Sequence, residues 1–444
     1  MNQPQAIGNR YMGIQMNSGI TALNTSAYFW ACLIGIMMST FIPQLQPYLL
    51  THTLQIPQEQ QGVISGNLSF WGEIALILTV GVWGSITDKY GRRIVTTCTY
   101  LIMAIACFLY PRAETYEQMI FARIVFGIGA AAYGCFVITI IADYATPQSR
   151  GKMTGIHALF NGLGALVTVF LWLRMPARLE AQGMSPLDAA LTTYNIVSVI
   201  CIVSALLMWF GINKNWPRQT GPQDSMLTIA KAGFVSAKNP KIALAYAAAF
   251  VSRGNLAIVG TFFTLWLANY GTAELGMTRA DALKQAAISL AIVNISVLIG
   301  APLIGILADR INRVTALVIT LLIAAIGYGG TYFIDNPFGP GMKMLAIIIG
   351  LGEVGCIIGS STLIAQESPV RIRGAVVGFF SACGAIGILI ASKVGGQLFD
   401  SWSPTAPFVL FGLFALIVAL CGIALRLWGN PEPDQGDELA HTGV

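Results

Sequence analysis

The sequence predicts an all-α integral membrane protein with twelve transmembrane helices in two pseudo-symmetric six-helix bundles. Of its 444 residues, 55% are hydrophobic and only 10% are charged, whereas soluble proteins carry about 25% charged residues. Twelve apolar runs are long enough to cross a bilayer, which takes about 20 residues each. The two halves of the chain also share a set of glycine, arginine and aspartate positions. This composition excludes an ordinary soluble enzyme, a nucleic-acid binder and a disordered scaffold.

Each predicted span is a run of apolar residues bounded by polar loops. Proline and glycine inside the runs do not argue against helix, since lipid forces backbone hydrogen bonds to form internally. The predicted spans are Ala27–Leu50, Gly62–Ile86, Ile94–Tyr110, Gln118–Ala142, Met153–Leu173, Ala189–Ile212, Ile242–Ala268, Gln285–Ala308, Val314–Ile334, Met344–Ala365, Gly374–Leu398 and Thr405–Leu427.

The distribution of lysine and arginine predicts the orientation. Sixteen of them fall on the side of the membrane that holds the N-terminus, and six fall on the other side. Because cytoplasmic loops are enriched in Lys and Arg, both termini are predicted to be cytoplasmic. We expect a monomeric, multi-pass protein of the cell membrane, with the bacterial inner membrane as its location.

An internal repeat divides the chain. Gly127, Gly129, Arg150, Gly151, Gly155 and Gly164 each recur 223 positions later. The predicted organisation is a cytoplasmic N-terminal segment (1–26), a six-helix bundle (27–212), a cytoplasmic linker (213–241), a second six-helix bundle (242–428) and a cytoplasmic tail (429–444). Residues 226–234 within the linker form a short amphipathic stretch, either on the membrane surface or part of a plain linker. Two such repeats favour a substrate site at their interface.

Several loop motifs resemble those of the major facilitator superfamily of secondary transporters. GSITDKYGRR (84–93) resembles its signature between spans two and three, and GILADRINR (305–313) resembles the second copy, with Asn312 where glycine is usual. RIVFGIGAA (123–131) is similar to the fourth-span motif, with Phe126 in place of the usual glutamine. PQSRG (147–151) and ESPVRIRG (367–374) resemble the loops after spans four and ten.

This resemblance implies a conformational latch at the cytoplasmic side, in which arginines pair with carboxylates when that side is closed. The alternative is that these arginines only anchor loops inside the cell. The latch candidates are Gly84, Asp88, Gly91, Arg92, Arg93, Arg150, Asp309, Arg310, Arg313, Glu367 and Arg373.

Ionisable residues inside spans are functional candidates, because each costs at least about 2.5 kcal/mol to insert. Glu353 is the first candidate for a proton carrier, since its repeat partner is Ala130 and the fold's symmetry does not require a carboxylate there. Glu73, Arg253 and Arg123 are the other proton-coupling candidates. The alternative is a static ion pair of Arg253 with Glu353 or Glu73.

Neutral polar residues at similar depth are candidates for the substrate cavity, or else form hydrogen bonds between helices. They are Gln44, Gln46, Asn161, Asn255, Trp266 and Asn294. His157 is more simply a structural histidine. The eight cysteines lie in apolar runs without a C-x-x-C spacing, so we interpret them as buried apolar residues and expect no metal site. No catalytic set or phosphate-binding loop is present, so we expect neither a cofactor nor an enzyme.

Three functions remain open. The first is proton-coupled transport of a small organic solute by alternating access, either a drug-like amphipathic metabolite or an organic anion. The fourth-span motif supports export, whereas the fifth span lacks the proline of drug–proton antiporters of this superfamily, which opposes it. The second is a lysolipid or lipid carrier of the same fold, to which residues 131–144 and 309–313 are loosely similar. The third is a non-transporting membrane sensor.

Overall fold

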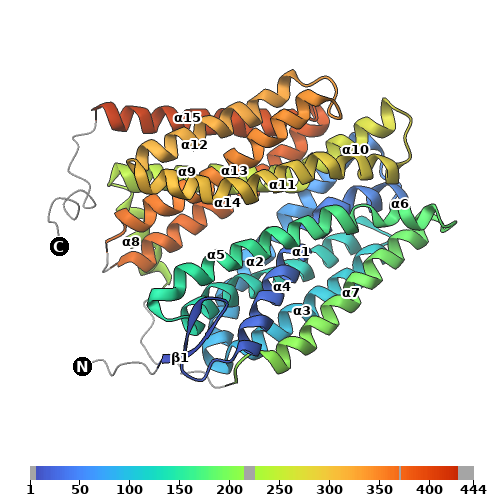
Figure 1. Cartoon of the computed structure of the whole chain (residues 1–444). Coiled ribbons are helices and arrows are strands. Elements are labelled where there is room, and N and C mark those ends of the chain that lie inside the picture. The colour runs from blue at the N-terminus through green and yellow to red at the C-terminus, as the bar shows by residue number, and fades with distance from the viewer. Residues whose placement is uncertain (1–6, 215–225, 370–371, 429–444) are drawn as a thin grey trace. The chain divides into compact units, whose positions relative to one another are not determined.

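The computed structural model describes residues 7–214, 226–369 and 372–428. The long elements are helices, and a short β-hairpin precedes them (Figure 1). The helices are α1 (Ala22–His52), α2 (Gln61–Tyr90), α3 (Arg92–Leu109), α4 (Tyr116–Tyr144), α5 (Arg150–Val167), α6 (Met175–Glu180), α7 (Pro186–Gly211), α8 (Met226–Ser236), α9 (Pro240–Ile258), α10 (Thr264–Ala273), α11 (Arg279–Arg310), α12 (Arg313–Gly329), α13 (Pro340–Glu367), α14 (Arg373–Ser401) and α15 (Ala406–Trp428).

Twelve helical segments of the described chain are long and apolar enough to cross a membrane, which confirms the predicted count. Two of them are composite. The fifth joins α5 to α6 through a π-helical turn, η4 (Thr168–Trp172), and the seventh joins α9 to α10 through another, η5 (Val259–Phe263). Such turns change the direction of side chains along a helix and are frequent at functional sites.

The chain divides into two compact units. The first contains residues 1–221 and 260–294, and the second contains residues 222–259 and 295–444. In the first unit α1 packs on α5 and α7, and α3 packs on α4 and α7. In the second unit α9 packs on α14 and α15, and α12 packs on α13 and α15. Helices that correspond in the sequence repeat therefore make corresponding contacts within each unit.

Two glycines related by the repeat explain one of these shared contacts. A Cβ on Gly164 of α5 would come well within 3.0 Å of the backbone oxygen of Leu33 on α1. A Cβ on Gly387 of α14 would do the same to the backbone oxygen of Phe250 on α9. Only glycine permits so close a crossing, so the same residue type holds the same helix pair together in both units.

The N-terminal segment, for which the sequence indicated no strand, forms a β-hairpin. Strand β1 (Ile7–Tyr11) pairs antiparallel with β2 (Ile14–Asn17). The turn residues Met12 and Gly13 both have positive φ, 49° and 77°, as a tight two-residue hairpin turn requires. Met16 forms a β-bridge with Ala145, and both Ile14 and Met16 are buried. The hairpin is therefore part of the folded first unit.

Helix α8 contains the amphipathic stretch of the linker and packs on α14. A Cβ on Gly233 would lie 2.7 Å from the backbone oxygen of Ala375, and the rings of Phe234 and Phe379 are 5.9 Å apart. Tyr246 of α9 donates a hydrogen bond to the Gly233 carbonyl at 3.0 Å. Packing against α9 and α14 within the second unit therefore explains the amphipathic pattern of α8.

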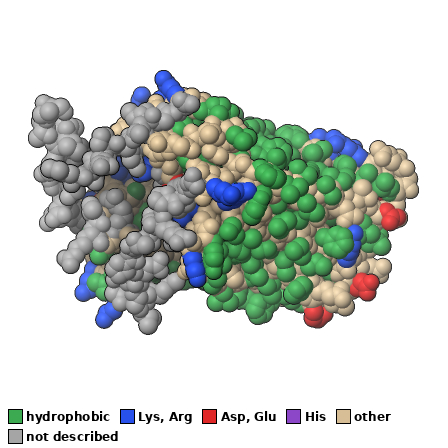
Figure 2. Space-filling view, turned by 90° about the horizontal axis from the view of Figure 1, so that it is seen from below, with side chains coloured by type: hydrophobic (Ala, Val, Ile, Leu, Met, Phe, Trp, Pro, Cys, Tyr) green, Lys and Arg blue, Asp and Glu red, His purple; other side chains and the backbone are tan. Residues whose placement is uncertain are grey.

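The outer surface is suited to lipid. Figure 2 shows a broad band of hydrophobic side chains, with Lys, Arg, Asp and Glu lying toward the two ends of the face drawn. Helices α3 and α7 expose a run of large apolar side chains: Leu101, Ile105, Phe108, Val199, Ile202, Val203, Leu206, Leu207 and Phe210. An apolar surface of this extent is unfavourable in water and favourable in the hydrocarbon of a bilayer.

Candidate functional site

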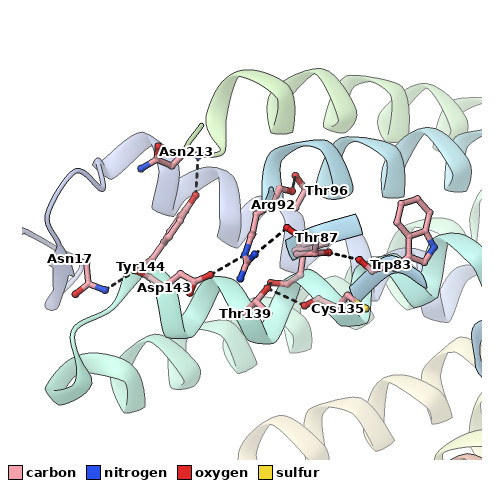
Figure 3. Close-up of polar contacts among 11 residues, drawn as sticks. Asn17, Trp83, Thr87, Arg92, Thr96, Cys135, Thr139, Asp143, Tyr144 and Asn213 are labelled. Atoms are coloured by element: carbon pink, nitrogen blue, oxygen red, sulfur yellow. Dashed lines mark hydrogen bonds and ion pairs between the residues drawn. The ribbon is translucent and has the colours of Figure 1, made fainter. Parts of the chain in front are cut away.

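The short connection between α2 and α3 contains a buried ion pair. Gly91 has φ of 90°, a conformation that favours glycine, and this turn places Arg92 at the first position of α3. Arg92 is 4% exposed, and its Nε lies 3.3 Å from Asp143 Oδ2 near the end of α4 (Figure 3). Its Nη1 donates to the Thr87 carbonyl at 3.1 Å. The guanidinium therefore joins the ends of α2, α3 and α4.

The hairpin and the end of α7 extend this network, and we call Asn17, Arg92, Asp143, Tyr144 and Asn213 the loop cluster (Figure 3). Asn17 Nδ2 donates to the Asp143 carbonyl at 2.7 Å, and the Asn213 backbone N–H donates to the Tyr144 hydroxyl at 3.1 Å. Burial raises the pKa of Tyr144 to about 12, although the Asn213 N–H acts in the opposite direction. Tyr144 is therefore a neutral hydroxyl near pH 7.

The other predicted latch residues have different surroundings. Arg93 stacks over the Trp209 ring at 4.2 Å, and Glu367 pairs with Lys241 at 3.3 Å. A Cβ on Gly84 would meet nothing within 4 Å, so no close contact requires that glycine. Arg150 and Arg310 are exposed and Arg313 is half-buried. The side chains of Asp88, Asp309 and Arg373 lie outside the described residues.

Asn312 shows why the second loop copy needs no glycine. Its φ is −53°, an ordinary value for any residue. Its side-chain oxygen caps α12 by accepting from the backbone N–H groups of Val314 and Thr315, at 3.0 and 3.4 Å. Asparagine is a preferred residue at this position because it satisfies helix N–H groups that otherwise lack partners.

Glu353 lies within the second unit, near the middle of α13, and is 7% exposed. The hydroxyl of Tyr328 on α12 lies beside its carboxylate, and that hydroxyl also donates to the Asn255 carbonyl of α9 at 3.2 Å. Among the described residues, Glu353 Oε2 has no hydrogen-bond partner and the carboxylate makes no ion pair. A carboxylate buried in this way is unusual unless it has a function.

Glycines on either side of Glu353 enclose it. A Cβ on Gly352 would lie 2.6 Å from Ala324 Cα, and a Cβ on Gly355 would lie 2.7 Å from Thr320 Cγ2. Both neighbours belong to α12, so α12 and α13 approach closely at the level of the carboxylate. Any larger residue at these positions would separate the helices and open the site.

The remaining ionisable candidates are less enclosed. Arg253 of α9 is exposed, and its aliphatic stem lies against Gly384 of α14. Glu73 is half-buried on α2. Arg123 of α4 is half-buried against Gly72, and within the described part of the chain its Nε and Nη1 have no hydrogen-bond partner.

The polar cavity candidates are mostly held between helices. Gln46 Oε1 accepts from the Tyr110 hydroxyl at 2.7 Å, and Trp266 is 5% exposed. Asn161 bonds to His157 at 3.0 Å. Among the described residues, four candidates retain buried amide atoms without a hydrogen-bond partner: Gln44, Asn161, Asn255 and Asn294.

Sequence reasoning missed two polar groupings in the first unit. Arg279, assigned by sequence to an outer loop, begins α11 and is 3% exposed. It donates to Asn269 Oδ1 and to Gln61 Oε1, both at 2.6 Å. The second grouping joins His157 of α5 to α1. The sequence feature that could have predicted it is a spacing of four residues between polar groups on each helix: Tyr28 and Cys32 on α1, and His157 and Asn161 on α5.

The comparisons with known proteins identify the family and the fold. The family model described as Major Facilitator Superfamily matches residues 27–391 and 295–443. The chain belongs to this superfamily. It is therefore a multi-pass membrane protein built on the fold of a transporter superfamily.

Two curated relatives come from Paramagnetospirillum magneticum. The magnetosome protein MamZ is 26% identical over 421 residues, which cover 90% of this chain but only 62% of MamZ. The magnetosome protein MamH is 24% identical over 428 residues, covering 94% of this chain and 95% of MamH. The chain thus spans less than two thirds of MamZ and nearly all of MamH.

Among solved structures, the nucleoside transporter NupG is similar with a TM-score of 0.69 and 15% identity. The match covers 92% of this chain and 100% of NupG. At this identity the likeness establishes the fold alone. The expected superfamily and fold class are both confirmed.

Proposed function

We propose that the protein is a proton-coupled secondary transporter of a small organic solute, which works by alternating access. The observation that carries the proposal is the carboxylate of Glu353, which is buried in a membrane-spanning helix and has one oxygen without a hydrogen-bond partner among the described residues. An ionised carboxylate without a nearby cation is strongly unfavourable in such surroundings. A Glu353 that alternates between water and this site would therefore exchange a proton in each cycle.

An organic anion is the solute class best supported. The Nε and Nη1 groups of Arg123 are buried and have no partner among the described residues, and unpaired charged donors are costly to bury. An anionic group of a solute would satisfy them. A drug-like amphipathic metabolite and a lysolipid are the alternatives that the experiment below distinguishes.

A ligand screen tests this function. The purified full-length protein is heated with panels of organic anions, organic cations and lysolipids, since a bound ligand raises the apparent melting temperature. Ligands that stabilise the protein are then tested for counterflow exchange in liposomes. Organic anions that both stabilise and exchange support the proposal. Exchange of lysolipids alone would favour the lipid carrier, and no exchange of any ligand would favour a sensor.

We also propose in which membrane the protein lies and that it is a monomer. The excess of Lys and Arg in alternate loops favours a bacterial inner membrane with both termini cytoplasmic, and a monomer in which lipid contacts the apolar surface. The similarity to MamH over nearly the full length of both chains favours a magnetosome-associated role. Imaging a C-terminal fluorescent fusion in a magnetosome-forming bacterium would test it, and a signal that never coincides with magnetosomes would reject it.

We infer that the loop cluster is the conformational latch of the first unit. Breaking a buried ion pair by removing one partner costs about 3–5 kcal/mol, so the Arg92–Asp143 pair favours the arrangement in which it forms. Asp143→Asn and Arg92→Ala should each increase thiol labelling from the cytoplasmic side of a single cysteine placed at Gln44. The native cysteines of the protein would first be replaced, so that the cysteine at residue 44 is the thiol that is labelled.

The matched control for the latch is Arg112→Ala. Arg112 is an exposed arginine of the same helical span, and its Nη1 donates to the Phe108 carbonyl, one turn away, at 2.7 Å. Labelling should not change in this variant. Equal labelling in wild type, Asp143→Asn and Arg92→Ala would reject the latch.

A further inference from the structure

The hydroxyl of Tyr328 lies between a buried carboxylate and a backbone carbonyl in the second unit. Tyr328 of α12 is 0% exposed, and its hydroxyl donates to the Asn255 carbonyl of α9 at 3.2 Å. The same hydroxyl is close enough to the Glu353 carboxylate of α13 for a side-chain hydrogen bond. A phenol has one hydrogen and donates to one of these two acceptors at a time. Tyr328 therefore has two alternative hydrogen bonds.

The charge on Glu353 decides which of the two acceptors is preferred. An ionised carboxylate accepts a charge-assisted hydrogen bond, which is about twice as strong as one to a neutral carbonyl. A protonated carboxyl has a hydrogen of its own and competes less for that of Tyr328. Tyr328 should therefore donate to Glu353 when Glu353 is ionised, and to Asn255 when Glu353 is protonated. The hydrogen bond in the structure corresponds to the protonated state.

The groups around the carboxylate leave this choice to Glu353 itself. Within the described residues, the titratable side chains that interact with Glu353 are the Tyr328 hydroxyl and the Cys356 thiol, three residues along α13. Arg253 of α9 and Lys393 of α14 are exposed. The other charged side chains described on α9, α12, α13 and α14 lie near the ends of these helices: Lys241, Arg313, Lys343, Glu367 and Asp400.

The Asn255 carbonyl marks the point at which α9 becomes the π-helical turn η5. The backbone N–H of Val259, the first residue of η5, is shared between the carbonyls of Asn255 and Leu256. The Asn255 carbonyl thus receives only part of a helical hydrogen bond, and Tyr328 supplies another. Asn255 is 0% exposed, and neither polar atom of its side chain has a partner among the described residues. Because unsatisfied buried groups cost free energy, this junction is poised to rearrange when the Tyr328 bond is withdrawn.

We infer that Tyr328 is a positioning residue that transmits the protonation state of Glu353 to the junction of α9 and η5. The inference rests on the proposed role of Glu353 as the proton carrier. A proton from water binds the carboxylate, the Tyr328 O–H turns from Glu353 to Asn255 without losing its own hydrogen, and the junction is held. Loss of the proton to water reverses each step. Since π-helical turns are frequent at functional sites, the junction is a suitable point for proton binding to alter the seventh span.

Hydrogen exchange of the backbone amides of residues 255–263 tests the inference, measured by mass spectrometry on the full-length protein in detergent. In wild type, exchange corrected for the intrinsic effect of pH should rise about fivefold from acid to alkaline pH, the factor expected for one ordinary hydrogen bond. Glu353→Gln should show the slow exchange at every pH, and Tyr328→Phe the fast exchange at every pH. A purely structural Tyr328 would change the level of exchange in Tyr328→Phe but leave its pH step.

The matched control is Tyr246→Phe. Tyr246 is a buried tyrosine of the same unit that also donates to a backbone carbonyl, that of Gly233, at 3.0 Å. Tyr246→Phe and Cys356→Ser should both keep the wild-type pH step. Far-ultraviolet circular dichroism and gel filtration check that each variant is folded. If Tyr328→Phe does not fold, a pH step that remains in folded Glu353→Gln protein overturns the inference.

An infrared measurement separates this inference from the proposed function. The carboxyl band that Glu353→Gln removes should change with pH in both wild type and Tyr328→Phe. A band that does not change in wild type would mean that Glu353 is not the proton carrier. If the band changes but folded Tyr328→Phe protein keeps the pH step in exchange, or wild type has no such step, Glu353 titrates without Tyr328 transmitting it, and this inference alone is overturned.

Discussion

Replacing Glu353 with glutamine is expected to abolish solute accumulation driven by a pH gradient while leaving counterflow exchange measurable. Glutamine has nearly the same shape and keeps a side-chain oxygen beside Tyr328, but it cannot bind or release a proton in the working pH range. Exchange of solute for solute needs no net proton movement, so it should persist. The measurement compares both activities in liposomes, using a solute found in the ligand screen.

The control is Glu117→Gln. Glu117 is exposed in the first turn of α4, so its replacement removes a carboxylate without touching the buried site. Gradient-driven accumulation should remain in this variant. A second readout needs no solute: the infrared carboxyl band that changes with pH in wild type should be missing in Glu353→Gln. Wild-type accumulation in Glu353→Gln would show that another group carries the proton.

The second large effect is expected at Gly164 and Gly387, where α5 crosses α1 and α14 crosses α9. Gly164→Ala and Gly387→Ala each place a methyl group against a backbone oxygen of the facing helix, which no side-chain rotation can relieve. Overpacking of this kind costs about 1–3 kcal/mol. We expect both variants to melt several degrees below wild type in detergent, as measured by a thermal unfolding assay.

Other glycines of the same helices provide the control, since a Cβ on Gly155 of α5 or Gly378 of α14 would meet nothing within 4 Å. Alanine is favoured over glycine inside a helix by about 1 kcal/mol. Gly155→Ala and Gly378→Ala should therefore be neutral or slightly stabilising. If all four variants had the same melting temperature, the close approach of two helices would not be the reason for glycine at residues 164 and 387.

The helices could be predicted because a segment that crosses lipid must be apolar along most of its length. Every span is a predominantly apolar run, and a helix is the only local structure that satisfies its backbone in hydrocarbon. The glycine register could be predicted for a related reason, since positions that bring two backbones together tolerate no other residue. Gly164 and Gly387 are the clearest case.

The polar groupings could not be predicted because they depend on helix rotation and on long-range contacts. Hydropathy places His157 at a depth, but the direction of its ring toward Tyr28 and Cys32 depends on how α5 packs on α1. The burial of Arg279 follows from Gln61, which lies far away in the sequence. The hairpin gave no signal either, because its strands are short and their partner, Ala145, is remote.

The N-terminal hairpin has a consequence for how the protein is made. The backbone N–H of Gln15 donates to Ser149 Oγ at 3.0 Å, across a separation of 134 residues, so the hairpin must wait for four membrane spans before its docking surface exists. Until then Ile14 and Met16, which end up buried, are exposed. Final assembly of the first unit is thus delayed until α5 has begun to emerge from the ribosome.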